Sequence, residues 1–237
     1  MISVCMATYN GEKYLAEQLD SILCQISDDD ELIISDDGSK DSTLRIINDY
    51  AVKFKNIILI DGPKQGVIKN FENALKLAKG EYIFLTDQDD IWKKNKVQTI
   101  LKYFTSTGCQ VVLHDADIID ANLNIISESF YKHRGSKQGL LRNIYKNSYL
   151  GCCMAFTKKT LNQALPFPNN IEMHDWWIGL IGESNKSTLF ISEKLISYRR
   201  HGNNVSSFHH HPLPKMISNR LCLLLQLVKR KAHLQND

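Results

Sequence analysis

The 237-residue chain is 43% hydrophobic and 23% charged, a composition typical of a globular protein with one large domain or two fused halves. No apolar run approaches the roughly 20 residues that a membrane-spanning helix needs. The net charge of +3 is uneven, because residues 212–237 carry +4 and the rest of the chain carries −1. A near-neutral body argues against a broad nucleic-acid-binding face.

The cysteines and the start of the chain indicate in which cellular compartment the protein works. The six cysteines form no C-x-x-C pair, and most stand in apolar runs, where a cysteine usually acts as a small buried hydrophobe. The chain opens on the strand-like run ISVCMAT, without a leader pattern of charged, apolar and small residues. We therefore expect a reducing, cytoplasmic environment.

The first half alternates apolar runs with helical patterns. Strands are expected at 2–8, 31–35, 57–60 and 81–85. The segments between them have helical spacing of apolar residues. This alternation favours an α/β fold with a mostly parallel sheet covered on both faces. In such sheets, ligands bind beyond the carboxyl ends of the strands.

The second half is less regular. The run at 110–114 and the segment GCCMAFT at 151–157 are expected to be strands. The segment HDWWIGLIG at 174–182 is expected to begin a buried helix, and the polar stretch 127–138 to be a loop. His114 and Asp115 are interpreted as a structural pair.

Carboxylates crowd the end of the fourth expected strand, in FLTDQDDIW at 84–92. On an extended backbone Asp87 and Asp89 face the same side, with Gln88 turned away. Two carboxylates on one side form a partial Mg²⁺ or Mn²⁺ site, which water and phosphate oxygens would complete. Asp90 is interpreted as the cap of a helix that begins at IWKKNKV.

Polar clusters also follow the first two strands. Tyr9 offers a flat surface for a nucleobase, although such a tyrosine is often half-buried core. Asp37 is a candidate for hydrogen bonds to a base or ribose. The chain has neither a G-x-x-x-x-G-K-[ST] loop nor a G-x-G-x-x-G turn, which excludes a P-loop site and disfavours a dinucleotide site. A bound nucleotide would therefore need a metal to neutralise its phosphates.

Five segments together resemble the family 2 inverting glycosyltransferases, over about residues 1–207: SVCMATYNGEKYLAEQLDSILCQ, LIISDDGSKDST, AKGEYIFLTDQDDIW, MHDWW and YRRHGNNVS. They are most similar to the bacterial rhamnosyltransferase-like branch. The resemblance implies a GT-A fold, an α/β class with a mostly parallel central sheet flanked by helices. It implies a nucleotide-sugar-binding half at 1–110 and an acceptor-binding and catalytic half at 111–208. Residues 209–237 are expected to form a basic amphipathic tail.

The resemblance also implies roles for the matching residues. Asp89, with Asp87 and His201, is the expected site for Mg²⁺ or Mn²⁺, and Asp175 is the expected catalytic base. Nucleotide contacts are expected from Ala7, Tyr9, Asp37, Lys69 and Asn70. Contacts to the diphosphate or the acceptor are expected from Arg199, Arg200, His174 and Trp176. Trp176 and Trp177 are expected to wall the site, with packing inside the helix as the open alternative for Trp177.

The implied reaction is metal-dependent, inverting sugar transfer to a glycan or lipid-linked acceptor in bacterial surface polysaccharide synthesis. L-rhamnose from dTDP-rhamnose is the candidate donor sugar. A UDP-hexose or UDP-N-acetylhexosamine donor stays open, because uracil and thymine differ by one methyl group. The alternative from another class is a nucleotide-sugar-binding partner without catalysis. A nucleotidyltransferase is disfavoured, because MATYNGEKYL lacks the glycine- and basic-rich loop that a triphosphate needs.

The tail has a basic amphipathic pattern. Its apolar residues with helical spacing are Ile217, Leu221, Leu224, Leu225 and Val228. Such a helix suits an anionic membrane surface, which would place the protein at the inner face of the cell membrane. Packing on the body or on another subunit is the open alternative. The run His209–His211 is not expected to bind a metal.

Overall fold

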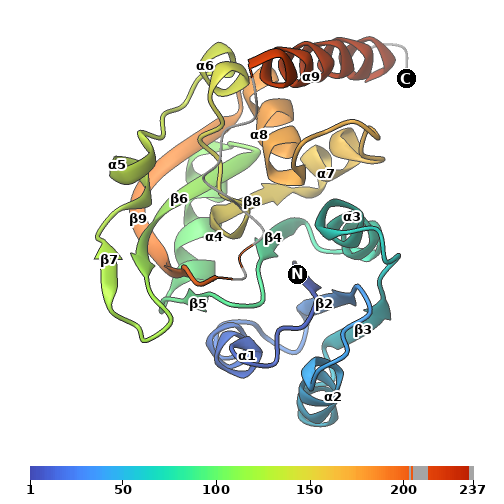
Figure 1. The fold of residues 1–237 in the computed structure, drawn as a ribbon, viewed down its shortest axis with the longest axis vertical. Coiled ribbons are helices and arrows are strands. Elements are labelled where there is room, and N and C mark those ends of the chain that lie inside the picture. The colour runs from blue at the N-terminus through green and yellow to red at the C-terminus, as the bar shows by residue number, and fades with distance from the viewer. Residues whose placement is uncertain (203, 205–212, 235–237) are drawn as a thin grey trace.

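The computed structural model describes residues 1–202, 204 and 213–234 (Figure 1). Its strands are β1 (Ile2–Thr8), β2 (Glu31–Asp36), β3 (Ile57–Asp61), β4 (Tyr82–Thr86), β5 (Ile91–Trp92), β6 (Val111–Ile119), β7 (Ile125–Ser127), β8 (Met154–Thr157) and β9 (Thr188–Arg199). Its helices are α1 (Leu15–Leu23), α2 (Thr43–Lys53), α3 (Val67–Leu77), α4 (Lys96–Thr107), α5 (Phe130–Arg134), α6 (Leu140–Tyr145), the 3₁₀ turn η1 (Gly151–Cys153), α7 (Lys158–Ala164), α8 (His174–Ser184) and α9 (Leu213–Leu234).

The strands form a nine-stranded sheet in the order β3-β2-β1-β4-β8-β6-β9-β5, with β7 beside β6. The first four strands are parallel, and β6 runs parallel to β9. Strand β8 is antiparallel to both β4 and β6 and so joins the two halves of the sheet. The α/β class is confirmed, with the parallel arrangement concentrated in the first half and a mixed arrangement in the second.

Two apolar cores lie on opposite faces of this sheet. In β1, Val4 and Met6 pack into one core while Cys5 packs into the other, as the alternation of side chains along a strand requires. Helices α1, α2 and α4 cover the first face, and α3, α7, α8 and α9 cover the second. The sheet is therefore buried on both sides, which is why its strands read as continuous apolar runs.

Helix α8 is buried along nearly its whole length. Gly179 and Gly182 allow its neighbours to approach closely. A Cβ atom on Gly179 would lie 2.7 Å from the ring of Tyr149, and one on Gly182 would lie 2.5 Å from Val111. These contacts hold α8 against the sheet and so fix the position of its first turn, which carries His174 and Asp175.

The tail helix α9 packs on the body through Leu223 and Leu227, which are buried among residues of the second core. The Arg230 guanidinium donates hydrogen bonds to the carbonyls of Gln163, Leu165 and Pro166. The apolar row expected from the sequence faces outward. In the part of the chain that the structure describes, no helix is both long and apolar enough to cross a membrane.

Three local expectations are wrong. Residues 151–153 of the expected strand form η1, and the strand begins only at Met154. The expected loop 127–138 contains α5, because the Ser129 side chain caps the amide of Lys132. The segment after Asp90 is β5, paired with β9, and the helix begins only at Lys96.

The close packing of α8 predicts that Gly179→Ala destabilises the fold, although alanine is the better helix former. We expect a loss of about 1–3 kcal/mol from overpacking against the buried Tyr149 ring. Urea unfolding with an unchanged m-value measures this loss. Gly202→Ala is the control, because no described atom lies within 4 Å of the added carbon. Equal stability of the two variants would contradict the packing described for α8.

Candidate active site

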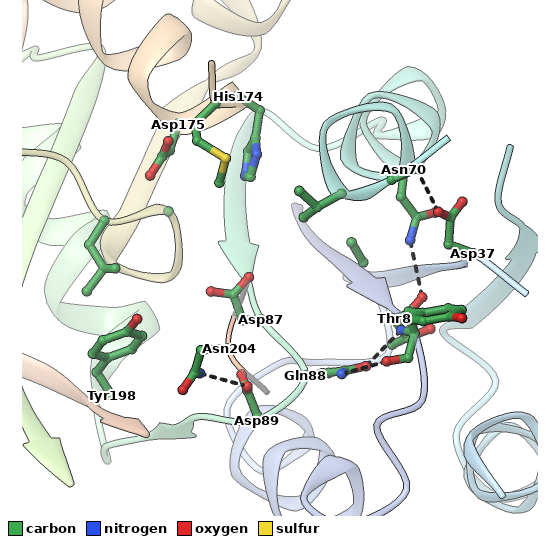
Figure 2. A pocket seen from close by; sticks show the side chains of 17 residues that line it. Thr8, Asp37, Asn70, Asp87, Gln88, Asp89, His174, Asp175, Tyr198 and Asn204 are labelled. Carbon is green, nitrogen blue, oxygen red and sulfur yellow. Dashed lines mark hydrogen bonds between the residues drawn. The ribbon is translucent and has the colours of Figure 1, made fainter. Parts of the chain in front are cut away.

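A cavity of about 430 Å³ opens where the carboxyl ends of β1, β2 and β4 approach the first turn of α8 (Figure 2). This is the position that the strand-end rule for parallel sheets predicts. Its lining residues are Ala7, Thr8, Tyr9, Asp37, Gly66, Val67, Asn70, Asp87, Gln88, Asp89, Leu150, Gly151, Met173, His174, Asp175, Tyr198 and Asn204.

Asp37 and Tyr9 stand together at one end of the cavity. The Asp37 carboxylate accepts hydrogen bonds from the amides of Lys64 (2.6 Å) and Gly66 (2.9 Å), which fix its orientation. The Tyr9 side chain is 55% exposed, so its ring offers a free face rather than core packing. This end has the flat surface and the oriented carboxylate that recognition of a nucleoside requires.

Asn70 lies in the cavity wall near Asp37. Its amide nitrogen donates to the carbonyl of Ser35 at 2.8 Å. Its carbonyl oxygen is buried and has no hydrogen-bond partner among the described residues. A buried acceptor left unpaired costs free energy, so this oxygen is suited to a donor group on a ligand.

Gln88 connects the ends of β1 and β4. Its side-chain oxygen accepts from the Tyr9 amide at 2.9 Å, and its nitrogen donates to the Tyr9 carbonyl at 3.1 Å. Gly11 makes room for this pair, because a Cβ atom there would lie 2.3 Å from the Gln88 oxygen. As expected, Gln88 turns away from Asp87 and Asp89 (Figure 2).

A compact acidic cluster lies beneath the cavity. One ligand atom each from Asp87, Asp90 and Cys152 all lie within 4.8 Å of one another. Burial, and then repulsion from neighbouring carboxylates, raises the pKa of Asp87 well above its usual value. Burial and the charge of Asp89 raise the pKa of Asp90 to about 7. One Asp90 oxygen is buried without a hydrogen-bond partner among the described residues.

Two basic residues support this cluster. Buried Lys96 donates to the Cys152 carbonyl at 2.8 Å and lies over the Trp92 ring at 4.1 Å. Its pKa is lowered to about 8 by burial, an effect that the nearby thiols and carboxylates oppose. Arg199 donates from its backbone amide to Asp90 (2.9 Å) and from its side chain to the Asp89 carbonyl (2.8 Å).

Asp89 is already held by two side chains. One of its oxygens lies 2.8 Å from His201 Nε2 and 3.3 Å from the amide nitrogen of Asn204. The family resemblance implies that Asp89 and His201 share a metal site, and the two side chains do lie together. It does not name Asn204, which stands in the same YRRHGNNVS segment. Asp90 was interpreted as a helix cap, and this is wrong, because its carboxylate faces the cluster and the Arg199 amide.

These residues suit a divalent cation. Crowded carboxylates with a buried, unpaired oxygen are stabilised by a positive charge, and carboxylate oxygens prefer hard cations such as Mg²⁺ or Mn²⁺. The Cys152 thiol stays protonated, since burial raises its pKa well above the usual value. The carboxylate oxygens of Asp87, Asp89 and Asp90 are therefore the candidate metal ligands.

Asp175 faces the cavity from the first turn of α8, away from the acidic cluster (Figure 2). One of its oxygens accepts from the Trp176 amide at 2.6 Å. Burial raises the pKa of Asp175 to about 6. Its carboxylate is thus ionised at neutral pH and more basic than an exposed aspartate, as a proton acceptor requires.

His174 lies beside Asp175 and stacks on Phe71, with ring centroids 4.1 Å apart. Both ring nitrogens are buried without hydrogen-bond partners among the described residues. Burial lowers the pKa of His174 to about 3, so the ring is neutral at physiological pH. A neutral imidazole with unpaired nitrogens suits a hydroxyl group on a ligand.

Four expected contact residues lie outside the cavity lining. Lys69 points to Glu72, at 2.6 Å, instead of toward a nucleotide. Arg199 is buried against Glu17 and Tyr14, so it supports the acidic loop from behind. Arg200 donates to the Tyr198 hydroxyl, at 3.1 Å, and Tyr198 itself lines the cavity.

Trp176 is the fourth of these residues. Its indole nitrogen donates to the Asn143 carbonyl at 2.8 Å, within the second core. It therefore does not wall the cavity as expected. Trp177 is also core, bonded to the Ala164 carbonyl at 2.9 Å. The run His209–His211 lies outside the described residues.

Comparison with known proteins agrees with this geometry. The model of "Glycosyl transferase family 2" matches residues 3–165. A dTDP-rhamnosyl transferase from Shigella flexneri, RfbG, is 31% identical over 216 residues, covering 84% of this chain and 72% of the relative. The Escherichia coli UDP-Glc:alpha-D-GlcNAc-diphosphoundecaprenol beta-1,3-glucosyltransferase WfgD is 25% identical over 210 residues, covering 87% and 80%.

A solved structure has the same fold. Residues 1–349 of Staphylococcus aureus TarS, in complex with UDP-GlcNAc, superpose with a TM-score of 0.73 at 21% identity. That comparison covers 97% of this chain and 66% of TarS 1–349. The family match over most of the chain and the shared GT-A fold lead to one assignment: this protein belongs to glycosyl transferase family 2.

Proposed function

We propose that this glycosyltransferase catalyses metal-dependent, inverting transfer of a sugar from a nucleotide-sugar to a glycan or lipid-linked acceptor in bacterial surface polysaccharide synthesis. One observation carries the proposal: Asp175 and the carboxylates of Asp87 and Asp89 face the same cavity, which ends at Tyr9 and Asp37. A nucleotide, a cation and a base thus have separate places in one space. We keep residues 1–110 as the donor half and 111–208 as the acceptor half.

The residues divide the chemistry between them. Asp175 takes the proton from the attacking acceptor hydroxyl, a step typically worth about 10²–10⁴-fold in rate. Asp89, with Asp87, would hold a divalent cation, whose positive charge would stabilise the departing diphosphate. Asp175 is the one lining carboxylate on the α8 side, so a single base and direct displacement with inversion fit the site.

L-rhamnose from dTDP-rhamnose is our leading donor. The name of the Shigella relative supports it. Leu150 and Met173 give the cavity an apolar wall beside Asp175, which suits the methyl group of a 6-deoxy sugar. The names of WfgD and of the TarS complex favour the alternative, a UDP-hexose or UDP-N-acetylhexosamine. A catalytically inactive binding partner is disfavoured, because Asp89 and Asp175 both reach the cavity.

We place the reaction in the cytoplasm, with the tail touching the inner face of the membrane. The described cysteines are all free thiols, which fits a reducing compartment. The proposed partners are a nucleotide-sugar donor and a glycan or lipid-linked acceptor, and nucleic acid takes no part in the reaction.

The function is tested by nucleoside diphosphate release with Mn²⁺ or Mg²⁺ from dTDP-rhamnose, UDP-glucose, UDP-galactose and UDP-N-acetylglucosamine. We expect release from one donor only, abolished by EDTA and restored by added metal. Asp89→Ala should lower the rate at least about 100-fold, because the cation loses its main ligand. If release without an acceptor is too slow to detect, calorimetry measures the binding of each donor instead. A protein that binds none of these donors in the presence of metal is not a glycosyltransferase of this kind.

Asp175→Asn should lower kcat by about 10²–10⁴-fold while leaving the donor dissociation constant unchanged. The amide keeps the shape of the carboxylate but accepts no proton. In the wild type, kcat/KM should rise with pH up to about 6 and then level off, because the carboxylate is protonated below its pKa. A variant with wild-type kcat, or a rate that falls as pH rises through 6, is incompatible with this base.

His174 should contact the sugar. We expect His174→Leu to weaken binding of the nucleotide-sugar about tenfold, since a buried hydrogen bond to a hydroxyl is lost. Binding of the corresponding nucleoside diphosphate should not change. The affinity of His174→Gln for the nucleotide-sugar should lie between those of the wild type and His174→Leu. Calorimetry with both ligands separates these effects. Equal losses for the two ligands would mean that His174 acts on the fold or on the nucleotide end.

A further inference from the structure

The tail helix has two apolar faces, and only one of them is covered. Leu223 and Leu227 are buried against the body. The row expected from the sequence lies on another side of the helix. Its exposed fractions are Ile217 58%, Leu221 56%, Leu224 37%, Leu225 61% and Val228 66%. Isolated exposed aliphatic residues are ordinary, but five on one helix face form a patch of the kind that marks an interaction site.

Helix α6 adds to this patch. It lies beside the start of α9 (Figure 1), and the Arg220 guanidinium donates to the Tyr145 carbonyl at 2.9 Å. Leu141 and Tyr145, one helical turn apart, are 80% and 76% exposed. We define the α6–α9 face as these two residues together with the five apolar residues of α9. It combines aliphatic side chains with a tyrosine, which favours the boundary between lipid and water.

The charged residues of α6 and α9 themselves are all basic. Residues 213–234 contain five Lys or Arg and no Asp or Glu. Residues 129–171, which include α6, contain seven Lys or Arg and again no Asp or Glu. Lys215, Lys229, Arg142 and Lys146 are all exposed. The net positive charge of the chain is therefore concentrated in the two segments that carry the exposed apolar residues.

This charge decides between the occupants. A second copy of the chain, pairing the α6–α9 face with itself, would bring basic residues against basic residues, which is unfavourable. An anionic bilayer attracts the lysines and arginines and accepts the aliphatic side chains beneath its headgroups. We propose that the α6–α9 face docks the enzyme on an anionic lipid surface, with α9 lying in the plane of the interface.

The proposal extends the tail contact named above to α6. Lipid binding itself is independent of the proposed function, and only its benefit to catalysis rests on that function. An acceptor carried on a lipid would then meet the enzyme at the surface on which it resides. Docking needs both attractions, since an apolar face without charge, or charge without apolar residues, gives only weak and reversible binding. The amphipathic helix lies on the bilayer and does not cross it.

The test is co-sedimentation of the full chain with vesicles of phosphatidylcholine alone and of phosphatidylcholine with 30% phosphatidylglycerol. We expect binding at least about tenfold stronger to the anionic vesicles, with most of the difference lost in 0.5 M salt. Leu221→Gln/Leu225→Gln and Leu141→Gln/Tyr145→Gln should each weaken binding about tenfold or more. Lys215→Gln/Lys229→Gln should weaken it only for anionic vesicles.

Val52→Gln is the matched control, because Val52 is 73% exposed on α2, outside the α6–α9 face, and should leave binding unchanged. Equal binding of both vesicle types, or no effect of the α6–α9 variants, overturns the proposal. A dimer would also overturn it: the wild type would be a dimer in light scattering, and the Leu221→Gln/Leu225→Gln variant would be a monomer that still binds vesicles. Vesicle binding needs no donor, so its failure is distinct from failure to bind a nucleotide-sugar.

Discussion

The site depends on holding several carboxylates together at the end of β4, where they repel one another. Asp87 and Asp90 are buried beside Cys152, and their raised pKa values measure the cost of that arrangement. Lys96 brings a buried positive charge close by, and Arg199 binds the backbone of the loop. Arg199 and Cys152, whose carbonyl binds Lys96, both belong to the second half, so the acidic end of a first-half strand is assembled only when the second half has folded around it.

The parts of the fold that the sequence predicted are those with local causes. The first four strands were predicted because parallel strands buried on both faces read as apolar runs. Ala7, Tyr9, Asp37, Asp87 and Asp89 all reach the cavity, because strand ends in such a sheet meet at one edge. Asn70 reaches it from helix α3. His174 and Asp175 were predicted from the family motif MHDWW and not from the periodicity of apolar residues.

The sequence-based predictions that were wrong concern residues whose structure depends on partners far away in the chain. Ile91–Trp92 is a strand because β9, about a hundred residues later, pairs with it. Trp176 looked like a cavity wall, yet helix α8 is buried on nearly all sides, so no apolar periodicity reveals which side faces the ligand. Cys152 and Lys96 had no signal, because Cys152 meets carboxylates that lie far from it along the chain and Lys96 binds the carbonyl of that distant Cys152. Arg199 matched the family pattern, but packing turned it behind the loop.

The paired hydrogen bonds between Gln88 and the Tyr9 backbone have an energetic consequence. Gln88 lies between Asp87 and Asp89, so Tyr9, the residue proposed to stack on the base, is joined directly to the loop proposed to hold the cation. A ligand that orders one strand end also orders the other. If a nucleoside and a metal bind at these two places as proposed, their affinities are linked by one coupling free energy, and each ligand changes the affinity of the other by the same factor. The first half would thus respond to its two small ligands as one unit.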